Sequence, residues 1–458
     1  MAGHERELRP AIAIWAALLA VVFAFHLTHR GILWVEEAYP AAAAIQMEHG
    51  RHLYSQIQFD KPPLSAEVYR LWSGQAGWPL RLAGAIYVTL CSWLAYLIAK
   101  KWWTFREGWT AALLLAFYLT FGIPAAVMAM APDLLTILPV LGAVLASIHA
   151  RPYAAGVCMG LAAGCNGKAL LLLPLLGLQA VPGFLICTGL SLMAFDTAAM
   201  WDQVWRWGAA YSRDAPVPAP ILEGVTRTLA WCGFQATAVA GAIWFFRREP
   251  SRLLAAWTVL GVAMVCLGLR FSPRYYLVLL PPVVLAGARG LTLLPARARW
   301  AVLSLLLIPA ARFGPRYAHL AMDPQSAWAD TAMNRDSAEA ARLIAAQARP
   351  GDTILVWGYR PDILVYTRLP LGSPFLDSQP LTGVLADRHL TRSDVTFPEL
   401  AARNRSRLSA LSPTWVVDGL GPYNPQLAVS RYPDLAPWLA RYGVAGETAG
   451  TRIYRLRR

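Results

Sequence analysis

Long apolar runs recur along most of this chain, and they limit it to a membrane fold. A helix needs roughly 20 apolar residues to cross a bilayer, and runs of roughly 15 to 20 residues follow one another from residue 11 to residue 313. We therefore predict about eleven transmembrane helices. They lie near residues 11–28, 82–99, 109–123, 134–149, 153–166, 169–180, 183–197, 226–246, 252–268, 276–289 and 299–313.

Composition supports a polytopic membrane protein. Of the 458 residues, 57% are hydrophobic and only 15% are charged, which is more apolar surface than a soluble core of this size can bury. The first apolar run follows "MAGHERELRP" and has no small-residue cleavage site, so we expect it to stay in the membrane as a helix.

The basic loops predict an orientation. If the N-terminus is cytoplasmic, the loops that are rich in Lys and Arg fall on the cytoplasmic side, as the positive-inside rule requires. These loops are 100–108, 149–152, 246–252 and 288–300. The net charge of +14 is then partly an orientation signal and partly a match for anionic membrane lipids, and nucleic acid is not an expected partner.

The hydrophilic segments all fall on the opposite, external side. They are a first loop over 29–81, a second loop over about 198–225, and everything after residue 314. We predict a transmembrane module over 1–314 and an extracytoplasmic α/β domain over 315–458, with strands at 353–358, 414–419 and 451–456.

The six cysteines lie in or beside apolar runs and have no metal-type spacing. We expect neither a disulfide framework nor a cysteine metal site. No cofactor is expected, and dependence on a divalent cation is left open.

Two adjacent carboxylates, Glu36 and Glu37, follow the first apolar run. On a helix they would point about 100° apart, so only one can face a given cavity. The alternative is an acidic first turn that is favourable with the helix dipole.

Lys61 stands before two prolines in "FDKPPL", and the prolines fix the backbone that presents it. A weak surface pair with Asp60 is the alternative. The chain has four lysines, and Lys100 and Lys101 are explained by orientation, which leaves Lys61 and Lys168 as candidates for a binding role. For Lys168, support of a helix end is the alternative.

Asp133 opens an apolar run at the external side, where it either caps a helix or faces the same cavity as the glutamates. Arg270 and Arg274 depart from the positive-inside pattern, and guanidinium groups suit phosphate oxygens. Snorkelling to the interface is the alternative for both arginines. Tyr275 is either an interface aromatic or a further substrate contact.

Carboxylates, lysines and arginines at one membrane face, without a nucleotide-binding loop, predict a lipid substrate that carries a phosphate. A transporter or flippase of a phosphorylated lipid is the competing class, and it would predict inverted repeats, interrupted helices and cations deep inside the spans, whereas the charges here cluster at the outer face. A non-catalytic scaffold would leave the charged residues dispersed.

The residues also carry a family resemblance. "WVEEAYPAAAAIQMEHGRHLYSQIQFDKPPL" resembles the first external loop of the GT-C glycosyltransferases of the protein O-mannosyltransferase and aminoarabinose transferase superfamily, in which Asp-Glu and an aromatic residue precede a helix and a Lys-Pro-Pro motif. Further matches follow in order: Arg81, "PDLL" with Asp133, "GLAAGCNGKALLLLP" with Lys168, and "RYYLVLLPPVVLAGARGL". "GDTILVWGYRPDILVYTRLPLGSPF" is similar to the periplasmic domain of the bacterial RgtA/B/C/D-like branch. Together these matches cover most of the chain.

The resemblance implies a GT-C fold in a bacterial inner membrane. It also implies transfer of a hexosyl or pentosyl group from a polyprenyl-phosphate carrier to a lipid, glycan or protein acceptor, usually with inversion. By motif position Glu36 is the general base, Lys61 binds the carrier phosphate, Arg270 and Arg274 stabilise the leaving group, and Asp133 lines the cavity. The family usually has Asp where Glu36 stands, so either Glu36 or Glu37 takes the role of base.

Overall fold

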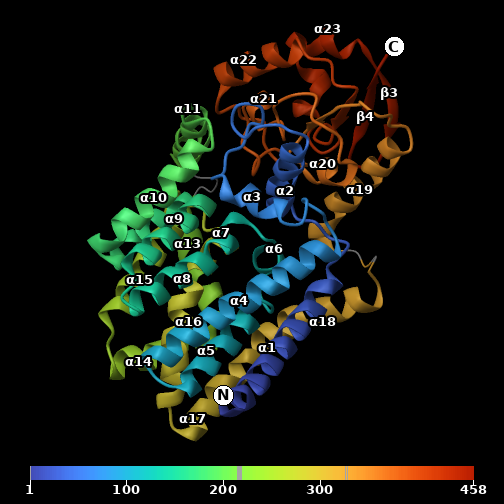
Figure 1. Ribbon diagram of the computed structural model, residues 1–458. Coiled ribbons are helices and arrows are strands. Elements are labelled where there is room, and N and C mark those ends of the chain that lie inside the picture. Colours follow the sequence, from blue (N-terminus) through green and yellow to red (C-terminus); the bar gives the residue numbers. More distant parts are fainter. Residues whose placement is uncertain (1, 214–218, 325, 327, 458) are drawn as a thin grey trace.

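A computed structural model describes residues 2–213, 219–324, 326 and 328–457. The following residues lie outside this description: 1, 214–218, 325, 327 and 458. All of them belong to the two predicted modules, and 214–218 also belong to the predicted loop 198–225. A helical bundle forms one end of the molecule and a small sheet with its helices forms the other, and α2 and α3 lie between them (Figure 1).

The α-helices of the first part of the chain are α1 (Ala2–Thr28), α2 (Val35–Glu48), α3 (Leu64–Arg70), α4 (Trp78–Trp102), α5 (Phe105–Tyr118), α6 (Pro124–Val127), α7 (Pro132–Leu135), α8 (Ile137–Ile148), α9 (Pro152–Cys165), α10 (Val181–Met193), α11 (Thr197–Met200), α12 (Trp207–Arg213), α13 (Pro220–Phe234), α14 (Ala236–Arg248), α15 (Arg252–Cys266), α16 (Leu280–Leu293), α17 (Ala296–Leu303) and α18 (Leu307–Met322). Tighter or wider helical turns link them: the 3-10 segments η1 (Gly167–Leu176), η2 (Leu178–Ala180), η4 (Pro273–Leu279) and η5 (Ser304–Leu306), and the π-helix η3 (Trp201–Arg206).

The predicted count of about eleven spans is not confirmed. In the described part of the chain, three helices are long and apolar enough to cross a membrane: Ala11–Thr28, Trp78–Trp102 and Pro273–Leu293. Two bent helix pairs would raise the number to five if each pair formed one span. Four further apolar segments are 10 to 17 residues long.

Sharp bends explain the difference. The run 226–246 is continuous in hydropathy, yet the chain turns by 93° between α13 and α14 at Gln235. The run 169–180 contains Pro174 and ends near Gly177, whose φ of +75° is outside helical range, and it forms two 3-10 segments instead of one helix. The run 299–313 is likewise divided among α17, η5 and α18.

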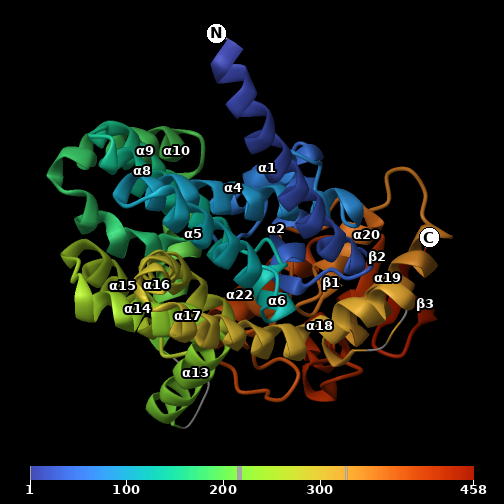
Figure 2. The ribbon, with the colours of Figure 1, turned by 90° about the horizontal axis from the view of Figure 1, so that it is seen from below.

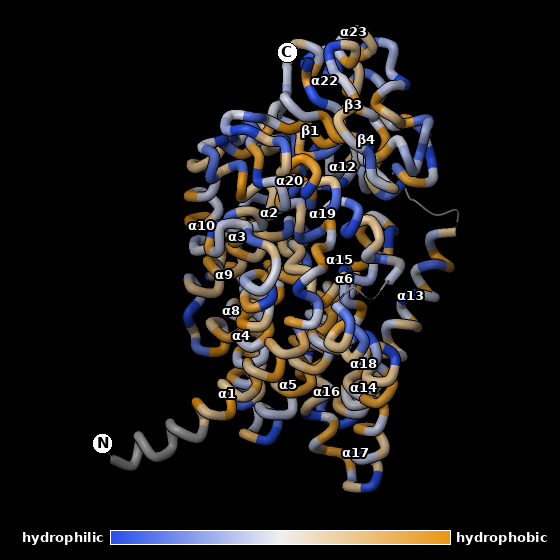
Figure 3. Tube along the Cα trace, turned by 90° about the vertical axis from the view of Figure 1, so that its right-hand side faces the viewer, coloured by the Kyte–Doolittle hydropathy of each residue, from blue (hydrophilic) through white to orange (hydrophobic). Residues whose placement is uncertain are grey.

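The bundle is layered around α16. In the most apolar stretch of the span Pro273–Leu293, 78% of the residues are buried inside the protein, whereas only 11% of the residues of Ala11–Thr28 in α1 are buried. Figure 2 shows α1 running along the outside of the bundle, and Figure 3 shows that apolar residues dominate the bundle while polar residues are frequent at the sheet end. The centre of the bundle is therefore protein core, and α1 presents an apolar surface suited to lipid.

Small residues let α14 approach α16 closely. A methyl group placed on Gly290 would overlap the carbonyl oxygen of Gly241, and one on Gly287 would lie 2.6 Å from the carbonyl oxygen of Ala238. Such small-residue contacts are a common way for membrane helices to pack.

The C-terminal part forms a four-stranded sheet in the order β1-β2-β4-β3. Its strands are β1 (Ile354–Trp357), β2 (Trp415–Asp418), β3 (Tyr442–Glu447) and β4 (Arg452–Leu456), and its helices are α19 (Ala332–Ala345), α20 (Asp362–Thr367), α21 (Gln379–Thr382), α22 (Pro398–Ser409) and α23 (Ala436–Leu439). Short 3-10 turns accompany them: η6 (Ala329–Thr331), η7 (Pro425–Leu427), η8 (Val429–Arg431) and η9 (Pro433–Leu435). β1 and β2 are parallel, and the other pairs are antiparallel.

All three predicted strands are confirmed as β1, β2 and β4. The sequence prediction missed β3, an edge strand that is largely uncovered. Its segment "YGVAGE" contains two glycines and a single β-branched residue, so it has little strand signal.

The first hydrophilic loop is docked on the sheet end of the molecule. The Gln46 side chain in α2 donates to the Leu369 carbonyl at 3.0 Å and accepts from the Leu371 backbone N–H at 2.8 Å. The Gln58 backbone N–H donates to the Pro374 carbonyl at 2.7 Å. These contacts hold the loop between the bundle and the sheet, where the candidate site lies.

Candidate active site

The first turn of α2 separates its two glutamates. The Glu37 side chain is fully buried and forms an ion pair with Arg81 of α4, which is also fully buried. It accepts the Trp34 N–H at 3.1 Å and the Met130 N–H at 3.4 Å. Burial raises the pKa of the Glu37 carboxyl, and the Arg81 guanidinium opposes that effect. Glu37 therefore joins α2 to α4, and it lines neither of the two pockets described below.

Glu36 points in another direction, to Arg274 of η4. The Arg274 guanidinium donates to the Glu36 carboxylate, and its Nε lies 3.6 Å from Asp133 Oδ2. One guanidinium thus bridges two carboxylates that are 97 residues apart in sequence. Glu36 and Arg274 are both partly exposed, with side-chain exposures of 24% and 28%, so the bridge borders open space.

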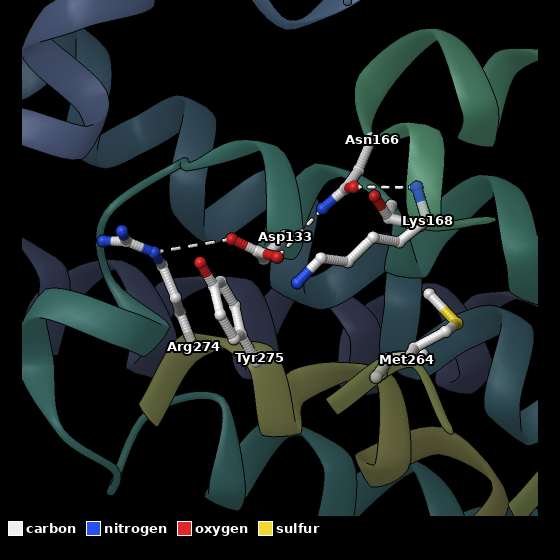
Figure 4. Close-up of a pocket in the computed structure, with 8 residues that line it drawn as sticks. Asp133, Asn166, Lys168, Met264, Arg274 and Tyr275 are labelled. Carbon is white, nitrogen blue, oxygen red and sulfur yellow. Dashed lines mark hydrogen bonds and ion pairs between the residues drawn. The ribbon is translucent and has the colours of Figure 1, made fainter. Parts of the chain in front are cut away.

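Asp133 continues the network into the bundle. Its Oδ1 accepts a hydrogen bond of 2.9 Å from the Asn166 amide, and Asn166 Oδ1 accepts the Lys168 backbone N–H at 3.1 Å (Figure 4). Asp133 does not cap α7, because the N-cap residue is Ala131. The capping alternative is wrong, and Asp133 faces a cavity.

Lys168 enters the same cavity from η1. Its ammonium lies 3.5 Å from the centroid of the Tyr275 ring, an arrangement of the cation–π type. Figure 4 shows this ammonium beside Asp133 and next to the Tyr275 ring. In the described part of the chain, no carboxylate forms an ion pair with it. Lys168 is thus a cation that is available to a ligand.

These side chains form one pocket, which we call the arginine pocket. Its lining combines polar and apolar groups, which come from α7, η1, α15, η4 and the turns beside α7 and η1. Its lining is Asp133, Thr136, Asn166, Lys168, Met264, Arg274, Tyr275 and Val278. Glu36 stands at its border through Arg274.

Lys61 lies near this pocket but does not line it. Its ammonium pairs with Asp60 at 3.0 Å, and 38% of its side chain is exposed. The surface pair anticipated as an alternative is therefore present. Its charge still acts on Lys168 and on Tyr275, which places it within electrostatic reach of the pocket.

Arg270 has a different environment from Arg274. Its guanidinium pairs with Asp387 of the C-terminal part, donates to the Tyr211 carbonyl at 3.0 Å, and lies 3.4 Å from the centroid of the Tyr211 ring. It therefore connects the loop before η4 with α12 and with the sheet end, outside the arginine pocket.

The structure thus brings together Glu36, Asp133, Lys168, Arg274 and Tyr275, whereas Glu37, Lys61 and Arg270 lie outside the pocket. In the described residues, no group of three or more His, Cys, Asp or Glu is arranged to hold a metal ion. In such a site the carboxylate can take up a proton, and the two cations beside it can bind an anion.

Sequence reasoning missed two further residues. Asn166 holds Asp133 in place, and its signal was the "CNGK" turn between apolar runs. Tyr359, after β1, contacts Tyr39 of α2 at 5.8 Å between ring centroids and is influenced by the charges of Glu36 and Arg274. Its position depends on how the C-terminal part docks, which no local pattern reveals.

Comparison with solved structures finds several similar proteins. ArnT from Cupriavidus metallidurans bound to undecaprenyl phosphate is 14% identical, with a TM-score of 0.65 over 97% of this chain and 98% of that chain. The apo state of ArnT is 15% identical, with a TM-score of 0.58 over 98% of each chain. The Archaeoglobus fulgidus oligosaccharyltransferase is 16% identical, with a TM-score of 0.48 over 96% of this chain and 73% of its own. No family model and no curated protein matches the sequence.

A helical bundle with a docked first loop and a C-terminal sheet defines the class of fold, which is GT-C. Within that class the chain has the architecture of ArnT along nearly its whole length. The fold implied by the sequence resemblance is confirmed.

Proposed function

We propose that this protein is a membrane glycosyltransferase that moves a hexosyl or pentosyl group from a polyprenyl-phosphate carrier to a lipid, polysaccharide or protein acceptor, with inversion. The supporting observation is the convergence of Glu36, Arg274, Asp133 and Lys168 at one pocket. A scaffold without activity would not require these charges to meet. The ArnT structure with undecaprenyl phosphate shows that a protein of this fold binds such a carrier.

The position of the pocket suits a substrate that is part lipid and part sugar phosphate. Met264 and Val278 line it beside the charged groups. They belong to α15 and η4, which are part of the apolar bundle. A prenyl chain would lie along the bundle while its phosphate reaches the cations.

In the proposed reaction Glu36 takes the proton of an acceptor hydroxyl, and the acceptor oxygen attacks the anomeric carbon of the sugar. The bond from that carbon to the phosphate oxygen breaks, and the electron pair leaves with the polyprenyl phosphate. Negative charge grows on the departing phosphate, so cations placed there stabilise the transition state more than the ground state.

Arg274 and Lys168 are the cations proposed to hold the phosphate. In the described structure Arg274 is shared by Glu36 and Asp133, and an incoming phosphate would compete for its guanidinium. That competition would free Glu36 to face the acceptor. Lys61 would add charge from the edge of the site, and Arg270 would position the loop that precedes η4.

The proposed location is a bacterial inner membrane, with the C-terminal part in the periplasm. The N-terminus and α17 lie at the end of the molecule opposite the sheet (Figure 1). α17 contains Arg297 and Arg299, and its loop was assigned to the cytoplasm on charge. The arginine pocket would then open on the external face, where a lipid-linked sugar donor would meet its acceptor.

The first prediction is that Glu36→Gln and Arg274→Gln abolish transfer by different routes. Purified chain is assayed with radiolabelled polyprenyl-phosphate sugars and a membrane-extract acceptor pool. Glu36→Gln should lower kcat by about a hundredfold or more while carrier binding persists, as expected for loss of a general base. Arg274→Gln should weaken binding of unglycosylated undecaprenyl phosphate.

Asp323→Asn is the matched control, since it makes the same kind of change at an exposed position at the end of α18 that does not line the pocket, and it should keep wild-type turnover. Full activity of Glu36→Gln would remove Glu36 from the mechanism. Carrier binding with no sugar consumed by wild type would contradict the enzyme and favour transport.

A further inference from the structure

A second pocket lies beside the arginine pocket and is lined from three regions of the chain. α2 and the first loop provide Tyr39, Gln58 and Asp60; η3 and α12 provide Gln203 and Trp207; and the C-terminal part provides Leu376, Asp377, Gln379 and Pro380. We call it the inter-domain pocket. Its lining combines two carboxylates, three amides and two aromatic rings.

Several of its polar groups lack complete hydrogen bonding within the described residues. The Tyr39 side chain is 3% exposed, its oxygen accepts only a long 3.4 Å bond from the Asp60 N–H, and its hydroxyl proton has no acceptor there. The Gln58 amide makes no side-chain hydrogen bond in that part of the chain. Buried polar groups are normally paired, so the buried Tyr39 hydroxyl indicates a polar ligand, and the half-buried Gln58 amide belongs to the same lining.

Asp377 adds an acceptor. It is 3% exposed, its Oδ1 accepts the Gln379 N–H at 2.7 Å, and its Oδ2 has only a 3.5 Å contact with the Gln379 amide. Burial, followed by the charge of Asp60, raises the pKa of the Asp377 carboxyl to about 7. Near neutral pH this carboxyl can therefore accept or donate a hydrogen bond.

By contrast, the side-chain amide of Gln203 already makes two hydrogen bonds within the protein. Its Oε1 accepts the Phe59 N–H at 2.9 Å, and its amide donates to the Tyr54 carbonyl at 2.7 Å. Gln203 shapes the wall of the pocket and holds the first loop in place. The groups left for a ligand are Tyr39, Gln58 and Asp377.

The two pockets are adjoining parts of one region. Tyr39 follows Glu36 by three residues in α2, which places both on the same face of the helix. Asp60 of the inter-domain pocket precedes Lys61, whose charge reaches the arginine pocket. Tyr359 is influenced by Asp60 and Asp377 on one side and by Glu36 and Arg274 on the other.

We propose that the inter-domain pocket binds a sugar ring, with Tyr39, Gln58 and Asp377 on its hydroxyl groups and Trp207 against its apolar face. A sugar presents adjacent donors and acceptors around a ring with apolar C–H surfaces, which matches carboxylate, amide and phenol groups beside an indole. The proposal rests on the proposed function, since the ring would belong either to the carrier-linked donor or to the acceptor.

The test measures sugar binding and transfer separately on the full chain. Saturation-transfer NMR with a panel of methyl hexosides, pentosides and hexosaminides reports ring binding. Asp377→Asn and Gln58→Ala should weaken that binding by about tenfold or more, the effect expected when a hydrogen bond to a buried or charged partner is lost. Binding of unglycosylated undecaprenyl phosphate should be unchanged in both variants.

Transfer kinetics then identify the source of the ring. A rise in KM for the polyprenyl-phosphate sugar alone assigns the pocket to the donor, and a rise for the acceptor alone assigns it to the acceptor. Asp202→Asn is the matched control: it removes a carboxylate that is 58% exposed and paired with Arg206, next to Gln203, and should leave both KM values unchanged.

The outcomes separate this inference from the proposed function. If wild type transfers sugar and both pocket variants keep wild-type KM values and glycoside binding, the inference is wrong and the proposed function stands. If wild type binds methyl glycosides through Asp377 but consumes no donor, the proposed function fails and the sugar pocket stands. Gln58→Ala serves if Asp377→Asn does not fold, because among the described residues the Gln58 side chain makes no hydrogen bond or ion pair with another part of the chain.

Discussion

Glu36 and Glu37 are chemically identical neighbours, and helix geometry gives them different tasks. Successive helical residues point about 100° apart. Glu37 therefore meets Arg81 inside the protein, while Glu36 meets Arg274 at the pocket. Glu37 thus fixes the first turn of α2 against α4, and this fixed turn positions Glu36 at the pocket.

Glu37→Gln should act on stability before chemistry. The substitution leaves the buried Arg81 guanidinium without its counter-charge, and breaking a buried ion pair typically costs about 3–5 kcal/mol. We expect a clear fall in Tm of the purified protein in detergent. Glu48→Gln, in the same helix, disrupts only a part-exposed pair with Arg368 and should cost at most about 1 kcal/mol. Equal Tm values for the two variants would contradict this account.

Part of the site could be predicted at this scale. Glu36, Asp133, Lys168 and Arg274 were marked out by charge where charge is rare, because a membrane chain retains few polar residues without reason. Asp377 and Tyr359 could not be found that way. They belong to a polar segment where Asp and Tyr are unremarkable, and only docking of that segment brings Asp377 to the inter-domain pocket and Tyr359 against Tyr39.

At the level of elements, close packing of α14 on α16 supports the bundle core. The bend at Gln235 lets α14 pack against α16, and glycines at the contact allow the two backbones to approach closely. This arrangement positions η4, which directly precedes α16 and carries Arg274. The bundle therefore sets the site through one continuous helical segment.

Gly290→Ala should destabilise the bundle, because its methyl group would overlap the Gly241 carbonyl of α14. Overpacking of this kind typically costs about 1–3 kcal/mol. Gly189→Ala in α10 is the control, since a methyl group there meets nothing within 4 Å and alanine favours helix. The check is thermal unfolding in detergent, and an unchanged Tm for Gly290→Ala would show that the helices can move apart freely.

Hydropathy predicted where apolar helices occur but not how many cross the membrane. It measures composition, and the bend at Gln235 and the 3-10 turns near Pro174 and Gly177 are matters of backbone geometry inside apolar runs. The strands β1, β2 and β4 were predictable because their β-branched residues are bounded by Gly, Pro or Asp. β3 depends on pairing with β4 rather than on its own sequence.

For the whole molecule, the proposed orientation predicts labelling from opposite sides of the membrane. In a cysteine-free background, Val444→Cys on β3 should react with a membrane-impermeant maleimide in spheroplasts, since Val444 is 59% exposed at the sheet end. Arg297→Cys in α17 should react only after the membrane is permeabilised, because α17 lies at the opposite end (Figure 1). The reverse pattern would place the site in the cytoplasm.

The docking of the first loop on the sheet end has a consequence for how such proteins diverge. Gln46 and Gln58 are bound to backbone groups between residues 369 and 374, some 300 residues later in the chain. The two segments form one surface although they are distant in the gene. A recombination event that exchanges only one of them would join mismatched halves, so new substrate preferences in this architecture are expected to arise by paired changes in both segments rather than by exchange of a module.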